Sequence, residues 1–337
     1  MDSQKGNSLK MDCEHMNQSL RWKFKTWVPI VKPFPIRTFP KRLTTKIRKL
    51  AIYGFHLGFS AMGIRGAKVV GSTRSRSSLL KLNRSSPLGI KGKVIQIPKD
   101  EVIFRSLRFF GMWEIEECLF LSDALKRVAS KTKVAFLDFG ANTGMVTLQT
   151  LGLAQTNAVV IMVEPLPSHV VCIDFNIADL RKTNAVHLYP FALGKINGKA
   201  KIFTENKNYG NTSLISNITP REDSIVSEIT IRKTEDFVEE VLRGYSDYVL
   251  KSDLQGYDAV VLASIPKDIY DRTEAAVVEI WALDGIDPSD VLQCLDLWGS
   301  FSQMSWSFDP TTKIYRAEVA DFWLNKTGES RNLFMVR

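Results

Sequence analysis

Short apolar runs alternate with helix-like segments through the last two-thirds of the chain, and this alternation most constrains the fold. The runs 134–137, 158–163 and 275–281 are apolar enough to be strands that are buried on both faces of a sheet. The segments 114–128 and 145–154 have the spacing of helices. Strands that alternate with helices predict an α/β fold, with a mostly parallel, doubly wound sheet that binds ligands at the carboxyl ends of its strands.

The section around residues 193–232 is less regular. Residues 199–203 and 228–232 alternate polar with apolar side chains, which predicts half-exposed strands. Between them, residues 208–213 are rich in Asn, Gly and Ser, which predicts a loop. This section therefore predicts a β-rich insertion, after which residues 248–251 form one more buried strand that ends at Asp253.

Charge is distributed unevenly along the 337 residues. Residues 1–100 hold 21 Lys and Arg but 4 Asp and Glu, whereas the remainder holds 24 and 32. We therefore expect a basic, acid-poor N-terminal extension over residues 1–100. An organellar transit peptide, a face that rests on an anionic membrane and a poorly ordered solvated segment all fit this composition. A cytoplasmic location is the default expectation, with organellar import through this extension as the main alternative.

Two classes of protein are disfavoured by the residues that are missing. The four cysteines are far apart and form no Cys-x-x-Cys pair, which argues against a zinc ribbon or a disulfide framework. No Gly-Lys-Ser/Thr follows the glycine-rich loop at residues 138–144, so the loop is not a phosphate-binding P-loop. The acidic balance of the body gives no reason to expect nucleic acid as a partner.

The first buried strand leads into Asp138-Phe139-Gly140-Ala141-Asn142-Thr143-Gly144. Gly140 and Gly144 permit a tight turn that a ligand can approach closely, and Asn142 is either a ligand contact or a plain turn residue. The loop lacks the G-x-G-x-x-G pattern of nicotinamide-binding folds. Asp138 would repel a pyrophosphate, whereas it would attract an ammonium or sulfonium group.

Glu164 ends the second strand, 20 residues after Gly144. A carboxylate at this place can accept hydrogen bonds from both ribose hydroxyls of a nucleoside. The alternative is a capping or surface acid before Pro165. Taken with Asp138 and the glycine loop, Glu164 favours S-adenosylmethionine as the cofactor.

Several motifs in this order resemble the FkbM-type S-adenosylmethionine-dependent methyltransferases, from about Phe110 to the end of the chain. Beside the glycine loop and Glu164-Pro165, the resemblance is carried by Gly111-Met112-Trp113-Glu114 with Glu117, Phe191-Ala192-Leu193-Gly194, Gly210 to Leu214, Lys251-Ser252-Asp253-Leu254-Gln255-Gly256, and Asn332-Leu333-Phe334. The chain departs from the family where it has Gln255 instead of the usual Glu and Asp258 instead of the final Glu of that motif.

The resemblance implies a class I Rossmann-like methyltransferase domain over residues 101–337 and methyl transfer to a hydroxyl oxygen of a sugar, a glycan or a hydroxylated metabolite. Asp138 is then expected to hold the methionine amino group of the cofactor. Gly140, Asn142 and Gly144 are expected to line the turn around its methionine portion, and Ala192 borders the adenine.

Asp253 and Lys251 are the candidate catalytic residues. Asp253 lies at the carboxyl end of the fourth strand, where it can accept the proton of a hydroxyl acceptor or bind a divalent metal that acidifies that hydroxyl. The alternatives are an Asp that caps the next helix or pairs with Lys251. Lys251 orients a substrate or pairs with an acid.

Three other function classes stay open. A nicotinamide-dependent dehydrogenase is disfavoured by the missing G-x-G-x-x-G pattern. A catalytically weak binding protein with the same fold is the second class. The third is a nucleic-acid-associated methyltransferase that is recruited by the basic arm, although residues 252–255 lack the N/D-P-P-Y/F pattern of enzymes that methylate base amino groups.

Overall fold

The computed structural model describes residues 66–73, 77–83, 90, 92–98, 101–129, 133–205, 208–213, 225–308 and 312–337. All described residues belong to one compact unit, Thr45–Arg337. The basic and apolar stretches before residue 66 lie outside the described residues. None of the helices in the described ranges is both long and apolar enough to cross a bilayer.

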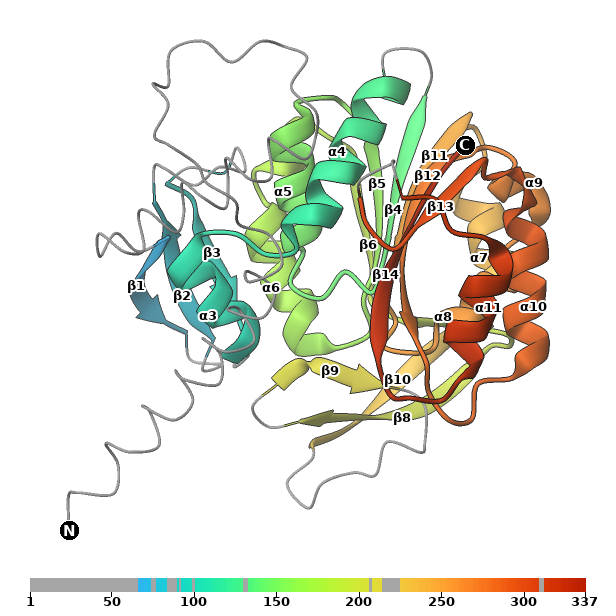
Figure 1. The fold of residues 1–337 in the computed structure, drawn as a ribbon. Coiled ribbons are helices and arrows are strands. Elements are labelled where there is room, and N and C mark those ends of the chain that lie inside the picture. The colour runs from blue at the N-terminus through green and yellow to red at the C-terminus, as the bar shows by residue number, and fades with distance from the viewer. Residues whose placement is uncertain are drawn as a thin grey trace, which may run out of the picture. The chain divides into compact units, whose positions relative to one another are not determined.

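A seven-stranded sheet forms the centre of the fold (Figure 1). Its strands, in spatial order, are β13 (Gln303–Ser305), β14 (Ser330–Val336), β12 (Thr273–Trp281), β11 (Asp247–Ser252), β4 (Val134–Phe139), β5 (Val159–Val163) and β6 (Val186–Tyr189). β14 runs antiparallel to both of its neighbours, and the other strands are parallel to one another. The predicted α/β architecture, with a mostly parallel, doubly wound sheet, is confirmed.

Helices cover both faces of this sheet (Figure 1). One face is covered by α4 (Ile115–Ala129), α5 (Met145–Ala154) and α6 (Pro167–Ile177). The other is covered by α7 (Thr234–Val241), α8 (Asp258–Leu262), α9 (Lys267–Tyr270), α10 (Pro288–Leu297) and α11 (Arg316–Leu324). Along β4, Phe136 packs on the first side, whereas Leu137 and Phe139 pack on the second, because successive side chains of a strand point to opposite faces. Short 3-10 helices lie between α6 and β6, at Leu180–Lys182, and between α10 and β13, at Trp298–Ser300.

The order of the strands determines where a ligand can bind. The chain passes from β4 to β5 and β6 on one side, and it returns to place β11 and β12 on the other side of β4. The loops that leave β4 and β11 therefore diverge, which opens a crevice at the carboxyl ends of these neighbouring strands.

A four-stranded sheet forms the predicted β-rich insertion. It consists of β7 (Ala192–Gly194), β10 (Ile225–Lys233), β8 (Gly198–Glu205) and β9 (Asn208–Ser213), in that spatial order. The prediction of a loop at 208–213 is wrong, because β9 pairs antiparallel with β8. Backbone hydrogen bonds to a neighbouring strand outweigh the weak strand propensity of Asn, Gly and Ser.

A three-stranded antiparallel sheet precedes the central one. Its strands are β1 (Ala67–Ser72), β2 (Ser78–Leu82) and β3 (Val94–Ile97), and α3 (Glu101–Phe110) follows. Leu80, Ile95 and Ile97 are fully buried in a core that also contains Met145 and Leu148 of α5. Residues 66–98 were expected to belong to a basic, poorly ordered or targeting extension. Where the structure describes them they are folded, and the domain boundary at residue 100 stays a prediction.

Candidate active site

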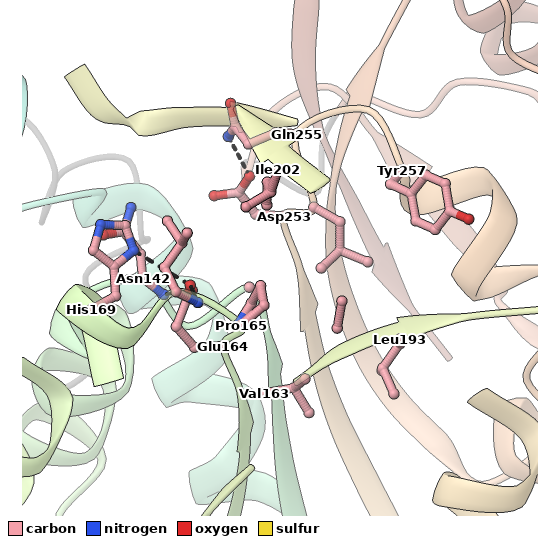
Figure 2. A pocket seen from close by; sticks show the side chains of 14 residues that line it. Asn142, Val163, Glu164, Pro165, His169, Leu193, Ile202, Asp253, Gln255 and Tyr257 are labelled. Carbon is pink, nitrogen blue, oxygen red and sulfur yellow. Dashed lines mark hydrogen bonds and ion pairs between the residues drawn. The ribbon is translucent and has the colours of Figure 1, made fainter. Parts of the chain in front are cut away.

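A cavity with about 620 Å³ of empty space, part of it open to solvent, lies where β4, β5 and β11 end. Its polar lining comes from Asn142, Glu164, His169, Asp253 and Gln255. Figure 2 shows Glu164, Asn142 and His169 as one group, with the Gln255 amide directed toward Asp253. The apolar lining is Val163, Pro165, Leu166, Ala192, Leu193, Ile202 and Leu254, and Gly140 and Tyr257 complete it.

The loop after β4 depends on positive backbone angles. Gly140, Asn142 and Gly144 have φ values of +74°, +52° and +73°. The left-handed region strains most side chains, and Asn tolerates it better than other residues do. Gly140 and Asn142 line the cavity, whereas Gly144 is turned away from it, against Met162 and Ile177.

Glu164 fixes this loop from the end of β5. Its Oε2 accepts a hydrogen bond from the backbone N–H of Asn142 at 2.8 Å, and its Oε1 accepts one from the N–H of Leu166 at 3.0 Å. The Nδ1 atom of His169 lies 3.4 Å from the same Oε1. Glu164 is 5% exposed and lines the cavity, so its carboxylate is held in one orientation beside the space in which a ligand would lie.

Asp138 and Lys251 lie behind the loop rather than in the cavity lining. They are register partners on β4 and β11, so their side chains project from the same face of the sheet, and the Lys251 Nζ lies 3.6 Å from the Asp138 Oδ1. Thr147 donates to the Asp138 Oδ2 at 2.6 Å, and Lys251 donates to the carbonyl oxygen of Gly140 at 2.7 Å. Burial raises the pKa of Asp138, although Lys251 opposes that shift. The assignment of Asp138 to a cofactor amino group stays a prediction.

The Lys251 ammonium lies between the carboxyl groups of Asp138 and Asp253. Burial alone would lower the pKa of Lys251, but Asp253 and Asp138 hold it above its ordinary value, so the ammonium stays charged. Lys251 is 4% exposed and donates to the loop backbone, so it is placed to position the loop, and its predicted contact with a substrate stays a prediction.

Asp253 faces the cavity as an anion. Its Oδ2 lies 3.5 Å from the Lys251 Nζ, and its Oδ1 accepts a hydrogen bond from Gln255 Nε2 at 2.7 Å. Burial would raise the pKa of Asp253, but Lys251 and hydrogen bonds from Glu279 and Gln255 bring it below the ordinary value. A carboxylate in this state accepts hydrogen bonds well and is a weak base.

The loop that carries Asp253 is held by Asp258. Ser252 donates to the Asp258 Oδ1 at 2.5 Å, and the backbone N–H of Leu254 donates to its Oδ2 at 3.1 Å. Asp258 is 1% exposed, and burial raises its pKa to about 7. This residue, at which the sequence departs from the FkbM-type motif, therefore acts on the shape of the loop.

Glu279, near the carboxyl end of β12, is a site residue that sequence reasoning did not single out. Its Oε2 accepts hydrogen bonds from Gln255 Nε2 at 3.1 Å and from Trp281 Nε1 at 2.8 Å. The signal in the sequence was a charged residue inside the apolar run 275–281. Among the described residues, no three or more His, Cys, Asp or Glu side chains are arranged to hold a metal ion.

Five of the eight predicted site residues line one cavity, namely Gly140, Asn142, Glu164, Ala192 and Asp253. Ala192, the first residue of β7, contributes to the apolar wall together with Ile202 of β8. The described parts of the insertion therefore contribute to the lining of the cavity. Apart from Ala192, the apolar lining was not predicted, because its members come from β5, β7, β8 and the loops that follow β5 and β11.

Three solved structures give the scale of similarity to known proteins. The methyltransferase FkbM from Methylobacillus flagellatus KT has a TM-score of 0.32 at 12% identity, over 60% of this chain and 43% of that one. A SAM-dependent methyltransferase from Agrobacterium tumefaciens has a TM-score of 0.37 at 11% identity, over 80% and 70%. Precorrin-6y C5,15-methyltransferase from Geobacter metallireducens GS-15 has a TM-score of 0.31 at 10% identity, over 66% of this chain and 88% of that one.

No family model and no curated protein sequence matches this chain. The resemblance to FkbM-type enzymes therefore stays a prediction. The low TM-scores do not assign a reaction or a substrate, and the function proposed next depends on the geometry of the cavity.

Proposed function

We propose that the chain is an S-adenosylmethionine-dependent methyltransferase whose donor binds in the cavity at the ends of β4, β5 and β11. The observation that carries the proposal is the position of two carboxylates, Glu164 and Asp253, on the lining of one cavity with the glycine loop beside them. Asp253, beside the glycine loop, would repel the pyrophosphate of a nicotinamide cofactor and attract a sulfonium, whereas Glu164 can accept hydrogen bonds from ribose hydroxyls.

The residues of the cavity fit this cofactor. The Oδ1 atom of Asn142 is buried and has no hydrogen-bond partner among the described residues, so it is available to a ligand donor. Glu164 would hold the ribose, the loop from Gly140 would hold the methionine portion, and the wall at Ala192 would contact the adenine.

When bound, S-adenosylmethionine supplies an electrophilic methyl group on a sulfonium. Asp253 would orient the attacking group, because an ionised carboxylate accepts a hydrogen bond from a hydroxyl and holds its oxygen in place. Asp253 would then take the proton that the hydroxyl loses. Its lowered pKa makes orientation the larger contribution and proton transfer the smaller one.

The acceptor is a molecule that offers a hydroxyl. Asp253 lines the cavity at the end of β11 as a carboxylate, so an acceptor group that brings a hydrogen-bond donor, as a hydroxyl does, fits beside it. A sugar, a glycan or a hydroxylated metabolite meets this requirement. Import into an organelle and contact of the basic arm with a membrane surface stay predictions.

Transfer of a labelled methyl group tests the proposal. The full chain is incubated with methyl-labelled S-adenosylmethionine and fractionated glycan and metabolite extracts, and the labelled product is identified. We expect a product labelled on oxygen, and we expect Asp253→Asn to lower its formation at least about a hundredfold. Donor binding without any labelled product would favour a binding protein with the same fold, and absence of both would overturn the proposal.

A further inference from the structure

Gln255 connects two carboxyl groups that come from neighbouring strands. Its Nε2 lies 2.7 Å from the Asp253 Oδ1 and 3.1 Å from the Glu279 Oε2. An amide nitrogen carries two hydrogens, so it can donate one to each carboxyl group. Gln255 makes this connection from a left-handed backbone, with φ +51°. A residue that is not glycine keeps such a conformation only where its surroundings enforce it, and such residues concentrate at functional sites.

The orientation of Glu279 identifies which of its oxygens bears a proton. Its Oε2 accepts two hydrogen bonds, from Gln255 and from the Trp281 indole. An oxygen that accepts two N–H donors is not the one that is protonated, so the proton belongs on the Oε1. Burial and the nearby Asp253 anion raise the pKa of Glu279 to about 10, and the protonated group shares a hydrogen bond with Asp253.

Other charged groups face this pair from the elements packed against it. Asp138 of β4 and Lys251 of β11 project from the same face of the sheet as Glu279. Glu114 precedes α4, Glu117 lies in its first turn, and Asp258 begins α8. The pKa of Glu114 lies well above its ordinary value because of burial and of Glu117, and burial raises the pKa of Glu117 to about 7.

We propose that Gln255 and Glu279 are positioning residues that hold Asp253 in the orientation from which it meets the methyl acceptor, with Glu279 acting as a neutral hydrogen-bond donor. This inference rests on the proposed methyltransferase function. It explains the Gln at position 255, where FkbM-type enzymes are expected to have Glu. A glutamate there would remove both N–H donors and add a third carboxyl group between two others.

Two ligands that differ at the methyl position provide the test. S-Adenosylhomocysteine lacks the methyl group, whereas sinefungin carries an amine in its place. In the full chain at pH 7, calorimetry should give tighter binding of sinefungin by about tenfold, because the amine makes a charge-assisted hydrogen bond to Asp253. The quantity compared between variants is the ratio of the Kd for S-adenosylhomocysteine to the Kd for sinefungin. Asp253→Asn should reduce that ratio to about one.

The positioning residues are tested by the same ratio. Gln255→Ala and Glu279→Ala should each lower it at least about threefold, because Asp253 loses its orientation. Glu279→Gln should restore it, since an amide is neutral, donates to Asp253 and accepts from Trp281. Glu239→Gln, on the exposed side of α7, is the matched control and should leave the ratio unchanged.

The outcomes separate the two proposals. If neither ligand binds the wild-type chain, the methyltransferase proposal fails. If both bind and the two alanine variants keep the wild-type ratio, the positioning role fails alone. If the ratio of the two Kd values falls as far in Glu279→Gln as in Glu279→Ala, the neutral state of Glu279 is contradicted. If an alanine variant does not fold, the isosteric Gln255→Glu replaces it, and a wild-type ratio in that variant would overturn the inference.

Discussion

A β-carbon placed on Gly140 would lie 1.9 Å from the carbonyl oxygen of Asp253. The turn after β4 and the end of β11 therefore touch through their backbones, at the point where the two strands diverge. The backbone N–H of Asp253 also donates to the carbonyl oxygen of Phe139 at 3.0 Å. This contact sets the distance between the glycine loop and the proposed catalytic carboxylate.

Gly140→Ala should disrupt this contact. The new methyl group meets backbone atoms, which cannot move aside as a flexible side chain can, and φ +74° adds strain. We expect the free energy of unfolding in urea to fall by more than about 3 kcal/mol and the affinity for S-adenosylhomocysteine to be lost.

Gly92→Ala is the control, because Gly92 has a similar φ of +70° and nothing within 4 Å of the new β-carbon. Its cost should be the backbone strain alone, about 1 kcal/mol. Equal costs for the two variants would show that the close approach at Asp253 does not matter.

Glu164→Gln should weaken cofactor binding while the chain stays folded. The amide can still accept the N–H of Asn142 or of Leu166, but it cannot accept hydrogen bonds on both of its terminal atoms. We expect the Kd for S-adenosylhomocysteine, measured by calorimetry, to rise at least about tenfold. Glu228→Gln, at an exposed ion pair with Lys199, should leave it unchanged. A Kd unaltered by Glu164→Gln would remove the ribose assignment.

Asn176→Ala should loosen the N-terminal sheet from the glycine loop. The Asn176 side chain accepts from the backbone N–H of Gln96 at 2.7 Å, and its Nδ2 donates to the carbonyl oxygens of Gln96 and Thr143, each at 2.8 Å. The substitution leaves buried backbone groups without partners, which should cost about 2–4 kcal/mol in urea denaturation. Asn184→Ala, at a half-exposed amide, is the control. A cost below about 1 kcal/mol for Asn176→Ala would contradict the bridging role.

Asp258→Asn should change how stability depends on pH. The ordinary pKa of Asp is about 3.9, and burial raises that of Asp258 to about 7. The folded state therefore holds the proton more tightly, so the stability that Asp258 contributes is fully present below about pH 4 and is lost as the pH rises toward 7.

Relative to wild type, the Asp258→Asn variant should therefore gain about 2 kcal/mol between pH 5.5 and 8. Urea denaturation at the two pH values measures this difference. Asp284→Asn, at an exposed ion pair with Lys326, should show no such gain. A difference between Asp258→Asn and wild type that is the same at both pH values would show that Asp258 does not titrate in this window.

The centre of the fold can be predicted from the sequence because its signals are local. β4 and β5 are buried along nearly their whole length, so each is a short apolar run, with Asp138 and Glu164 as the polar residues at or just after its end. β11 and β12 contribute the buried apolar runs 248–250 and 275–278. Gly140, Glu164 and Asp253 could be expected at one edge of the sheet for the same reason, since each follows directly on the end of such a strand, and all three line the cavity. Positions that line the cavity at the ends of strands can thus be recognised from the sequence alone.

The rest depends on contacts between distant residues. β3 was not predicted because its outer edge is paired with the Asn176 amide, 80 residues away, rather than with another strand. Glu279 acquires its position from the register of β12 against β11, which places it on the face that Lys251 occupies. No local pattern in the sequence predicts either contact.

Calorimetric titration of the purified full chain with S-adenosylhomocysteine tests the central claim most directly. We expect one site per chain with a Kd in the micromolar range or below, and competition by S-adenosylmethionine but not by a nicotinamide dinucleotide. A well-folded chain that shows no heat and no thermal stabilisation with either sulfur ligand would contradict the assignment of the Glu164–Asp253 cavity to a methyl donor.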